Sequence, residues 1–182
     1  QGYHAANALV EIWRTAPPGS GKAPPIVQQH LLKLFKCLGL SVSKETGEME
    51  CKGDSLQAIL KMSKGCTFVS RLLEQALLPP SAVQALLPTA LQVAVNPPSV
   101  DADTDQRLFM SIGRVAATLP QLHPRTLVKL VEAVQTEYAL SSQPRMECVH
   151  AILRRGTVMA ANDASFAPQW KETEAKFMKL LE

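Results

Sequence analysis

The sequence has few aromatic residues and no long apolar run. Aromatic side chains make up 5% of the 182 residues, so the alternation of aromatic and basic residues that lines a typical single-stranded RNA groove is missing. The most apolar segment, Leu86 to Val95, is interrupted by Pro88 and Gln92. It is far shorter than the roughly 20 residues that cross a bilayer. We therefore expect no membrane span and no aromatic groove for RNA.

Paired cysteines are also missing. None of the four cysteines belongs to a C-x-x-C pair, and none of the four histidines stands at a zinc-site spacing beside them. The first five residues lack both the basic start and the apolar core of a signal peptide. We expect buried, reduced thiols, as in a cytosolic or nuclear protein, and no metal or other cofactor.

Motifs that would indicate catalysis are scarce. The run Gly19-Ser-Gly-Lys22 has Ala16 where a phosphate-binding loop needs glycine, and Ala23 where it needs serine or threonine. Cys148 and His150 are two positions apart, so on a helix they point to different sides and cannot form a nucleophile and base pair. We expect no enzymatic activity and no small-molecule substrate.

An internal repeat is the most informative positive feature. The helix, proline turn and helix that begin at Arg71 recur 43 positions later from Arg114, a period typical of stacked two-helix units. The sequence predicts one all-α domain over residues 1–182, an α-α superhelix of stacked HEAT-like or armadillo-like hairpins with eight or nine helices. Because the chain starts at Gln1 and stops at Glu182 within a helical pattern, we expect a fragment of a longer protein.

Glycine and proline predict where the helices begin and end. Gly39 is placed to end an amphipathic helix in a left-handed cap, and Pro124 suits the first turn of a later one. The segments 16–25 and 41–53 are rich in turn-forming or polar residues, and both are predicted loops.

Two further signals concern the flanks of helices. Asp54, with Gln57 three residues later, resembles a capping box that starts a helix. Arg154 and Arg155 precede Gly156, which predicts a helix end at this glycine, with the two arginines close to its last carbonyls.

Basic side chains supply the candidate partner-binding residues. In a stack of repeats, Arg71 and Arg114 would occupy equivalent positions and line one surface. Arginine favours protein interfaces, because its planar fork pairs with carboxylates and carbonyls together. The alternative is a structural role, in which these side chains are solvated, pair with carboxylates such as Glu74 or cap helix ends. The candidates are Lys64, Arg71, Arg107, Arg114, Arg154 and Arg155.

Several motifs in fixed order resemble a known family. The run from Gln57 to Leu73, then Leu119-Pro120, then Ile152 to Gly156, then Gln169 to Met178 resembles the C-terminal domain of the Pat family of mRNA-decapping activators, also called proteins associated with topoisomerase II. The resemblance covers Ser55 to Leu181. Family members have a basic run around the first glycine, of which this chain keeps Lys64 and Arg71; Ser63, Cys66 and Thr67 replace the rest.

The resemblance implies a non-catalytic scaffold in cytoplasmic mRNA decay that acts in P-bodies. Pat-family C-terminal domains promote decapping by binding the Lsm ring and leucine-rich motifs of the decapping enzyme, so these are the expected partners. Two alternatives stay open: a HEAT-like adaptor of another pathway, and a domain that binds single-stranded RNA directly. The formal charge of +3 is too small to indicate RNA binding by bulk electrostatics.

Overall fold

The computed structural model describes residues 25–62, 65–74, 78–95, 102–134 and 142–179. Within these ranges the chain forms eight helices and one two-stranded antiparallel sheet, which confirms the predicted all-α class. Lys64 and residues 16–24 of the first predicted loop lie outside the described residues. In chain order the elements are α2 (Pro25–Leu38), β1 (Leu40–Val42), β2 (Met49–Cys51), α3 (Gly53–Leu60), α4 (Gly65–Glu74), α5 (Pro80–Val95), α6 (Ala102–Thr118), α7 (Pro124–Ala133), α8 (Gln143–Asn162) and α9 (Ala167–Met178).

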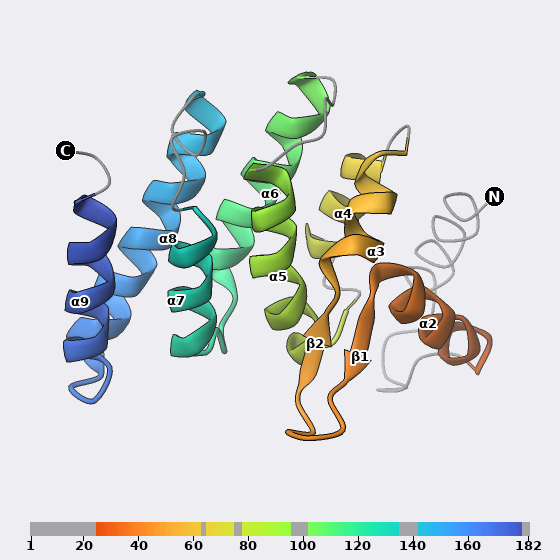
Figure 1. Ribbon diagram of the computed structural model, residues 1–182, viewed down its shortest axis with the longest axis horizontal. Coiled ribbons are helices and arrows are strands. Elements are labelled where there is room, and N and C mark those ends of the chain that lie inside the picture. Colours follow the sequence, from red (N-terminus) through yellow and green to blue (C-terminus); the bar gives the residue numbers. More distant parts are fainter. Residues whose placement is uncertain (1–24, 63–64, 75–77, 96–101, 135–141, 180–182) are drawn as a thin grey trace.

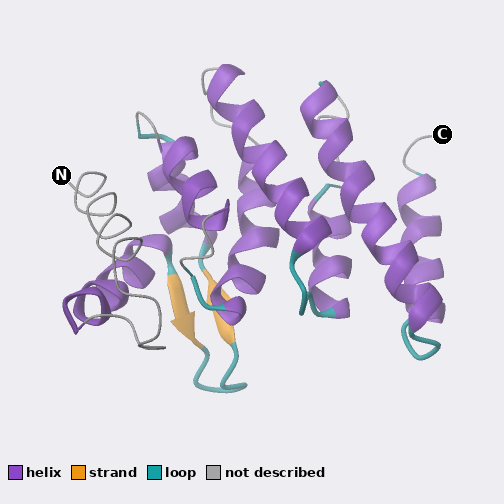
Figure 2. Cartoon of the chain, turned by 180° about the vertical axis from the view of Figure 1, so that it is seen from behind, coloured by secondary structure: helices purple, strands orange, loops and turns teal. Residues whose placement is uncertain are grey.

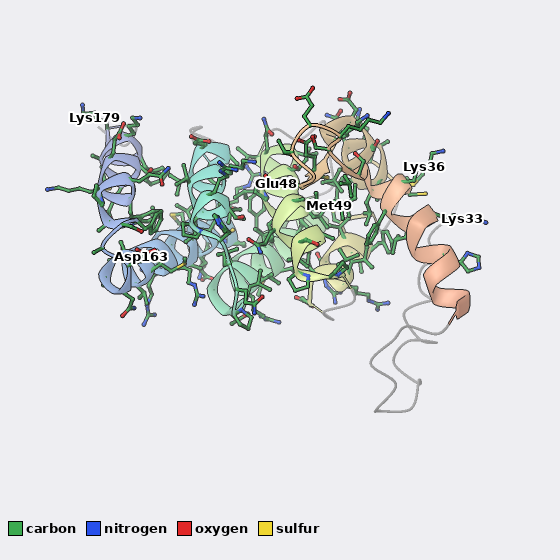
Figure 3. The ribbon with its side chains drawn as sticks, turned by 90° about the horizontal axis from the view of Figure 1, so that it is seen from below. Lys33, Lys36, Glu48, Met49, Asp163 and Lys179 are labelled. Carbon is green, nitrogen blue, oxygen red and sulfur yellow. The ribbon has the colours of Figure 1, made fainter. Side chains whose placement is uncertain are left out.

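The helices from α3 onward form two parallel layers (Figure 1). One layer contains α4, α6 and α8, and the other contains α3, α5, α7 and α9; neighbours within each layer are in contact, and Figure 2 shows the layers from behind. Figure 3 shows the same two rows end-on, with Lys179 and Lys33 at opposite ends of the stack. The repeat seen in the sequence corresponds to the α4–α5 and α6–α7 hairpins, and α8–α9 adds a third unit.

Helix α5 is the centre of the core. Its sequence contains no charged residue, and it contacts helices α3, α6 and α7 and both strands. Full burial of a leucine or valine contributes about 1.5–3 kcal/mol to the free energy of unfolding. Because α5 contacts both the β-hairpin and the helical repeats, its buried side chains hold these two parts of the domain together. Its buried side chains are Ala82, Val83, Leu86, Leu87, Ala90, Leu91, Ala94 and Val95.

Gln84 fixes the position of the following hairpin relative to α5. Its side-chain Nε2 donates to the carbonyl of Gln121 at 3.1 Å. Its Oε1 accepts from the backbone N–H of His123 at 2.8 Å and from the Thr126 hydroxyl at 3.1 Å. One amide therefore satisfies three groups of the turn that leads into α7, where Pro124 occupies the predicted first turn.

The prediction of a loop over residues 41–53 is wrong in part. Leu40–Val42 pairs antiparallel with Met49–Cys51, and α3 begins already at Gly53. Strands of three residues are too short to show a period of two, which is why the pattern missed them. Gly39 ends α2 with φ 76, as predicted. A Cβ here would lie 2.7 Å from the Lys52 carbonyl oxygen, so the close approach of the hairpin also requires glycine.

Two predicted helix boundaries are also wrong. The N-cap of α3 is Lys52, without a side-chain hydrogen bond, so Asp54 and Gln57 do not form a capping box. Gly156 does not end a helix, because α8 continues to Asn162. Gly156 is instead buried under the ring of Trp170 in α9, where a Cβ would overlap the indole. This long-range contact has no signature in the local sequence.

Candidate protein-binding surface

Arginine and lysine are segregated between the two layers. Helices α4, α6 and α8, here called the arginine layer, contain no lysine and carry Arg71, Arg107, Arg114, Arg145, Arg154 and Arg155. In the opposite layer, α7 and α9 carry Lys129, Lys171 and Lys176 together with Arg125. Interfaces between proteins are enriched in arginine and methionine and depleted in lysine. The composition therefore singles out the arginine layer.

Arg71 and Arg114 lie on adjacent helices of this layer. Arg71 is half-buried on α4. Arg114, on α6, is paired with Glu74 of α4 at 3.6 Å, and the same carboxylate oxygen accepts a 2.7 Å hydrogen bond from Ser111. Arg114 therefore has the alternative, structural role, because it pairs with a carboxylate on the neighbouring helix. Its side chain is still 63% exposed, and such a pair contributes at most about 1 kcal/mol.

Arg107 begins an exposed stripe along α6. It stands seven residues before Arg114, and Met110 lies between them on the same side of the helix. Both Arg107 and Met110 are exposed, with 49% of the methionine accessible. On α8, Met146 is 47% exposed. Exposed flexible apolar side chains beside arginines are typical of surfaces that bind other proteins.

The two consecutive arginines of α8 have different roles. Arg155 is half-buried and donates to two carbonyls at the end of α6, those of Ala117 at 3.3 Å and Leu119 at 3.1 Å. It therefore caps a neighbouring helix, where a positive charge is favourable. Arg154 is exposed and remains available to a partner. The predicted placement of both residues at the end of their own helix is wrong, because α8 continues beyond them.

Arg145 is not part of the exposed surface. It is 7% exposed, and its guanidinium carbon lies 4.8 Å from the centre of the Phe109 ring. This cation–π contact joins the beginning of α8 to α6. The side chain was not among the sequence candidates, and its position in the first turn of α8 gives no local indication of burial.

An open depression of about 310 Å³ lies where α6 and α8 meet on the arginine layer. Its lining combines apolar groups with basic and titratable ones: Ala117, His150, Ala151, Arg154, Arg155 and Val158. His150, Arg154 and Val158 follow one another at intervals of four and so form one stripe of α8. His150 and Val158 were not among the residues predicted from the sequence, because only the packing of α8 against α6 shows that this stripe lies beside Ala117.

The opposite layer has a different electrostatic character. Two of its exposed basic side chains form ion pairs: Arg125 with Glu48 at 3.5 Å, and Lys176 with Glu172 at 2.7 Å. A second depression, of about 250 Å³, lies between α5 and α7 and contains both Lys129 and Glu132. This depression therefore offers an acidic partner less net positive charge than the one between α6 and α8.

The prediction of buried thiols is correct for two of the four cysteines and wrong for the others, since Cys51 is half-buried and Cys37 is exposed. Cys66 and Cys148 are buried, and burial raises the pKa of Cys148 to about 12. Because His150 is exposed while Cys148 is buried, the two face different environments. Within the described ranges, no group of three or more potential metal ligands comes together. The expectation of a non-catalytic chain stays a prediction.

Comparison with known proteins adds no assignment: no family model, curated protein or solved structure matches the chain. Among the described helices, none has both the length and the apolar character required to cross a membrane.

Proposed function

We propose that this chain is a non-catalytic scaffold domain in cytoplasmic mRNA decay, which promotes decapping by binding the Lsm ring and leucine-rich motifs of the decapping enzyme. The resemblance to Pat-family C-terminal domains supplies the identity of these partners. The observation that supports a binding role is the concentration of arginine on α4, α6 and α8, in helices free of lysine. Arg107, Arg114 and Arg154 are exposed there.

Such a scaffold depends on an extended surface formed by several stacked helices. Two layers of helices share one interior, which leaves the outer face of each layer available over several repeats. Arginines on that face would steer an acidic partner and fix its register more than they would increase its affinity. A leucine-rich helical motif could lie across neighbouring helices of the layer, with its leucines as anchors.

The direct test is capture of purified partners on the immobilised domain. We expect the Lsm ring and leucine-rich peptides of the decapping enzyme to be retained. Reversal of charge in Arg71→Glu and Arg114→Glu should weaken retention of the ring. The melting temperature should change little in Arg114→Glu, because the Arg114 side chain is largely exposed. If the unmodified domain retains neither the ring nor the peptides, the proposal is wrong.

Direct RNA binding is distinguished by its dependence on salt. The large exposed apolar side chains of the described residues are valines and methionines, with no aromatic among them, so a stacking platform for bases is not supported. If RNA were the ligand, the affinity for oligoadenylate would fall with a log–log slope of about −0.7 per phosphate contacted. We expect weak binding of oligoadenylate, and binding of the leucine-rich peptide that hardly changes with salt.

A further inference from the structure

The depression between α6 and α8 has the features of a specific docking site. Its lining includes the exposed or half-buried apolar groups Ala117, Ala151 and Val158, and the side chains that can carry charge are His150, Arg154 and Arg155. Among the described residues that line it, none is a carboxylate. A lining of apolar and basic groups without a carboxylate among them fits a ligand that is both apolar and acidic.

The geometry points to one occupant: we propose that an acidic segment of a partner protein inserts a single large aliphatic side chain, such as leucine, against Val158 and Ala151. A carboxylate of the same segment pairs with Arg154. The volume, about 310 Å³, is at the lower end of the range for ligand pockets, about 300–1,000 Å³. It therefore suits one anchor side chain and not a whole helix.

Rigid surroundings make the site suitable for recognition. Arg155 forms one side of it and is held by the carbonyls of Ala117 and Leu119. A Cβ at position 113 would lie only 3.0 Å from the Cα of Cys148, so α6 and α8 approach closely at Gly113, beside the depression. A partner would thus meet a preformed surface and lose less free energy to ordering.

The corresponding depression on the opposite layer serves as an internal comparison. It is of similar size, about 250 Å³, but Lys129 and Glu132 both line it, so its charges offset one another. An acidic segment should discriminate between the two depressions by charge alone. This contrast also provides control substitutions at matched places.

The inference rests on the proposed binding role of the arginine layer, and not on the identity of the ring as the partner. It is tested by selecting a display library of helical peptides of about 16 residues on the unmodified domain. Selected peptides should be enriched in leucine together with aspartate or glutamate. Their affinity should fall about tenfold or more in Val158→Asp and in Arg154→Glu, and should not change in Lys129→Glu.

Backbone and methyl NMR of the domain with a selected peptide gives the second readout. Shifts centred on Ala151, Arg154 and Val158 are expected. Peptides without acidic enrichment, shifts centred on α5 and α7, or affinity unchanged by both substitutions would overturn the inference. Preferential loss of oligoadenylate binding in Arg154→Glu, with no effect on peptides, would overturn it in favour of RNA.

The two proposals fail separately. If acidic peptides bind at α6 and α8 while neither the Lsm ring nor the decapping-enzyme peptides are captured, the docking site stands and the role in mRNA decay falls. If the ring is captured but no acidic peptide is selected, the role stands and this site falls. Circular dichroism of both variants shows whether they fold, which is expected because Val158 and Arg154 are exposed.

Discussion

Gly156 of α8 lies directly against the indole ring of Trp170 in α9, and this contact sets how closely the last two helices approach. Both residues are buried, and a Cβ at position 156 would overlap three carbons of the ring. Phe166 extends the contact, with its ring centre 5.9 Å from that of the tryptophan. The last hairpin of the stack therefore depends on the absence of a side chain at one position.

Gly156→Ala should destabilise the domain, although alanine is the better helix former. The gain in helix propensity is about 1 kcal/mol, while overpacking of a well-filled core costs about 1–3 kcal/mol or more. We expect a lower midpoint of urea unfolding, measured by circular dichroism. Gly53→Ala is the control, since a Cβ there meets only Thr89 at an ordinary 3.9 Å. Equal stability of the two variants would show that α9 readjusts freely.

Gln84→Ala should cost about 1–1.5 kcal/mol, because the part-buried Thr126 hydroxyl loses its partner while the exposed groups of His123 and Gln121 can bind water instead. The amide accepts from His123 and Thr126 and donates to Gln121. Chemical denaturation measures the loss. In the control Gln143→Ala, an exposed contact with Glu147 within one helix is removed, which should cost at most about 0.5 kcal/mol. If both substitutions cost the same, the turn does not depend on this amide.

Replacement of the two consecutive arginines of α8 one at a time should separate a structural residue from a binding residue. Arg155→Ala removes two charge-assisted hydrogen bonds to the end of α6 and should lower the free energy of unfolding by about 1.5–3 kcal/mol. Arg154→Ala alters an exposed side chain and should change the free energy of unfolding by no more than about 0.5 kcal/mol. Thermal and urea unfolding of both variants test this order, and the reverse order would contradict the capping role.

Thiol labelling should distinguish the cysteines by burial and pKa. Cys148 is buried and its pKa is raised to about 12, so at pH 8 almost none of it is the reactive thiolate. Cys37 is exposed on α2. Mass spectrometry after treatment with iodoacetamide should find Cys37 modified first and Cys148 modified only after unfolding in urea. Rapid modification of Cys148 in the folded protein would show that α6 and α8 separate readily.

The features that sequence analysis predicted correctly are those that depend on neighbouring residues. Gly39 ends α2 in a left-handed conformation, and Pro124 occupies the first turn of α7. Both effects arise from the backbone preferences of a single residue. The recurrence of Arg71 at Arg114 likewise marked two adjacent hairpins, because a repeat carries its packing pattern with it.

The features that were missed depend on contacts between distant residues. Gly156 has the local sequence of a helix end, and only Trp170, packed against it from the next helix, explains a glycine inside α8. Arg155 reaches the carbonyls of a different helix, which its own neighbours in sequence do not reveal. The depression requires α6 and α8 to lie side by side, so its lining could not be assigned before the stacking was known.

The central claim is that the arginine layer is the surface that binds partners, and a comparison of two triple charge reversals tests it most directly. One variant combines Arg107→Glu, Arg114→Glu and Arg154→Glu; the other combines Arg125→Glu, Lys129→Glu and Lys171→Glu on the opposite layer. All six side chains are exposed, and both variants change the net charge equally.

Affinity for the immobilised Lsm ring, measured by interferometry at constant salt, is predicted to fall about tenfold or more in the first variant and to stay within about twofold in the second. An equal loss in both variants, or a loss confined to the second, would contradict the assignment of the binding surface to α4, α6 and α8.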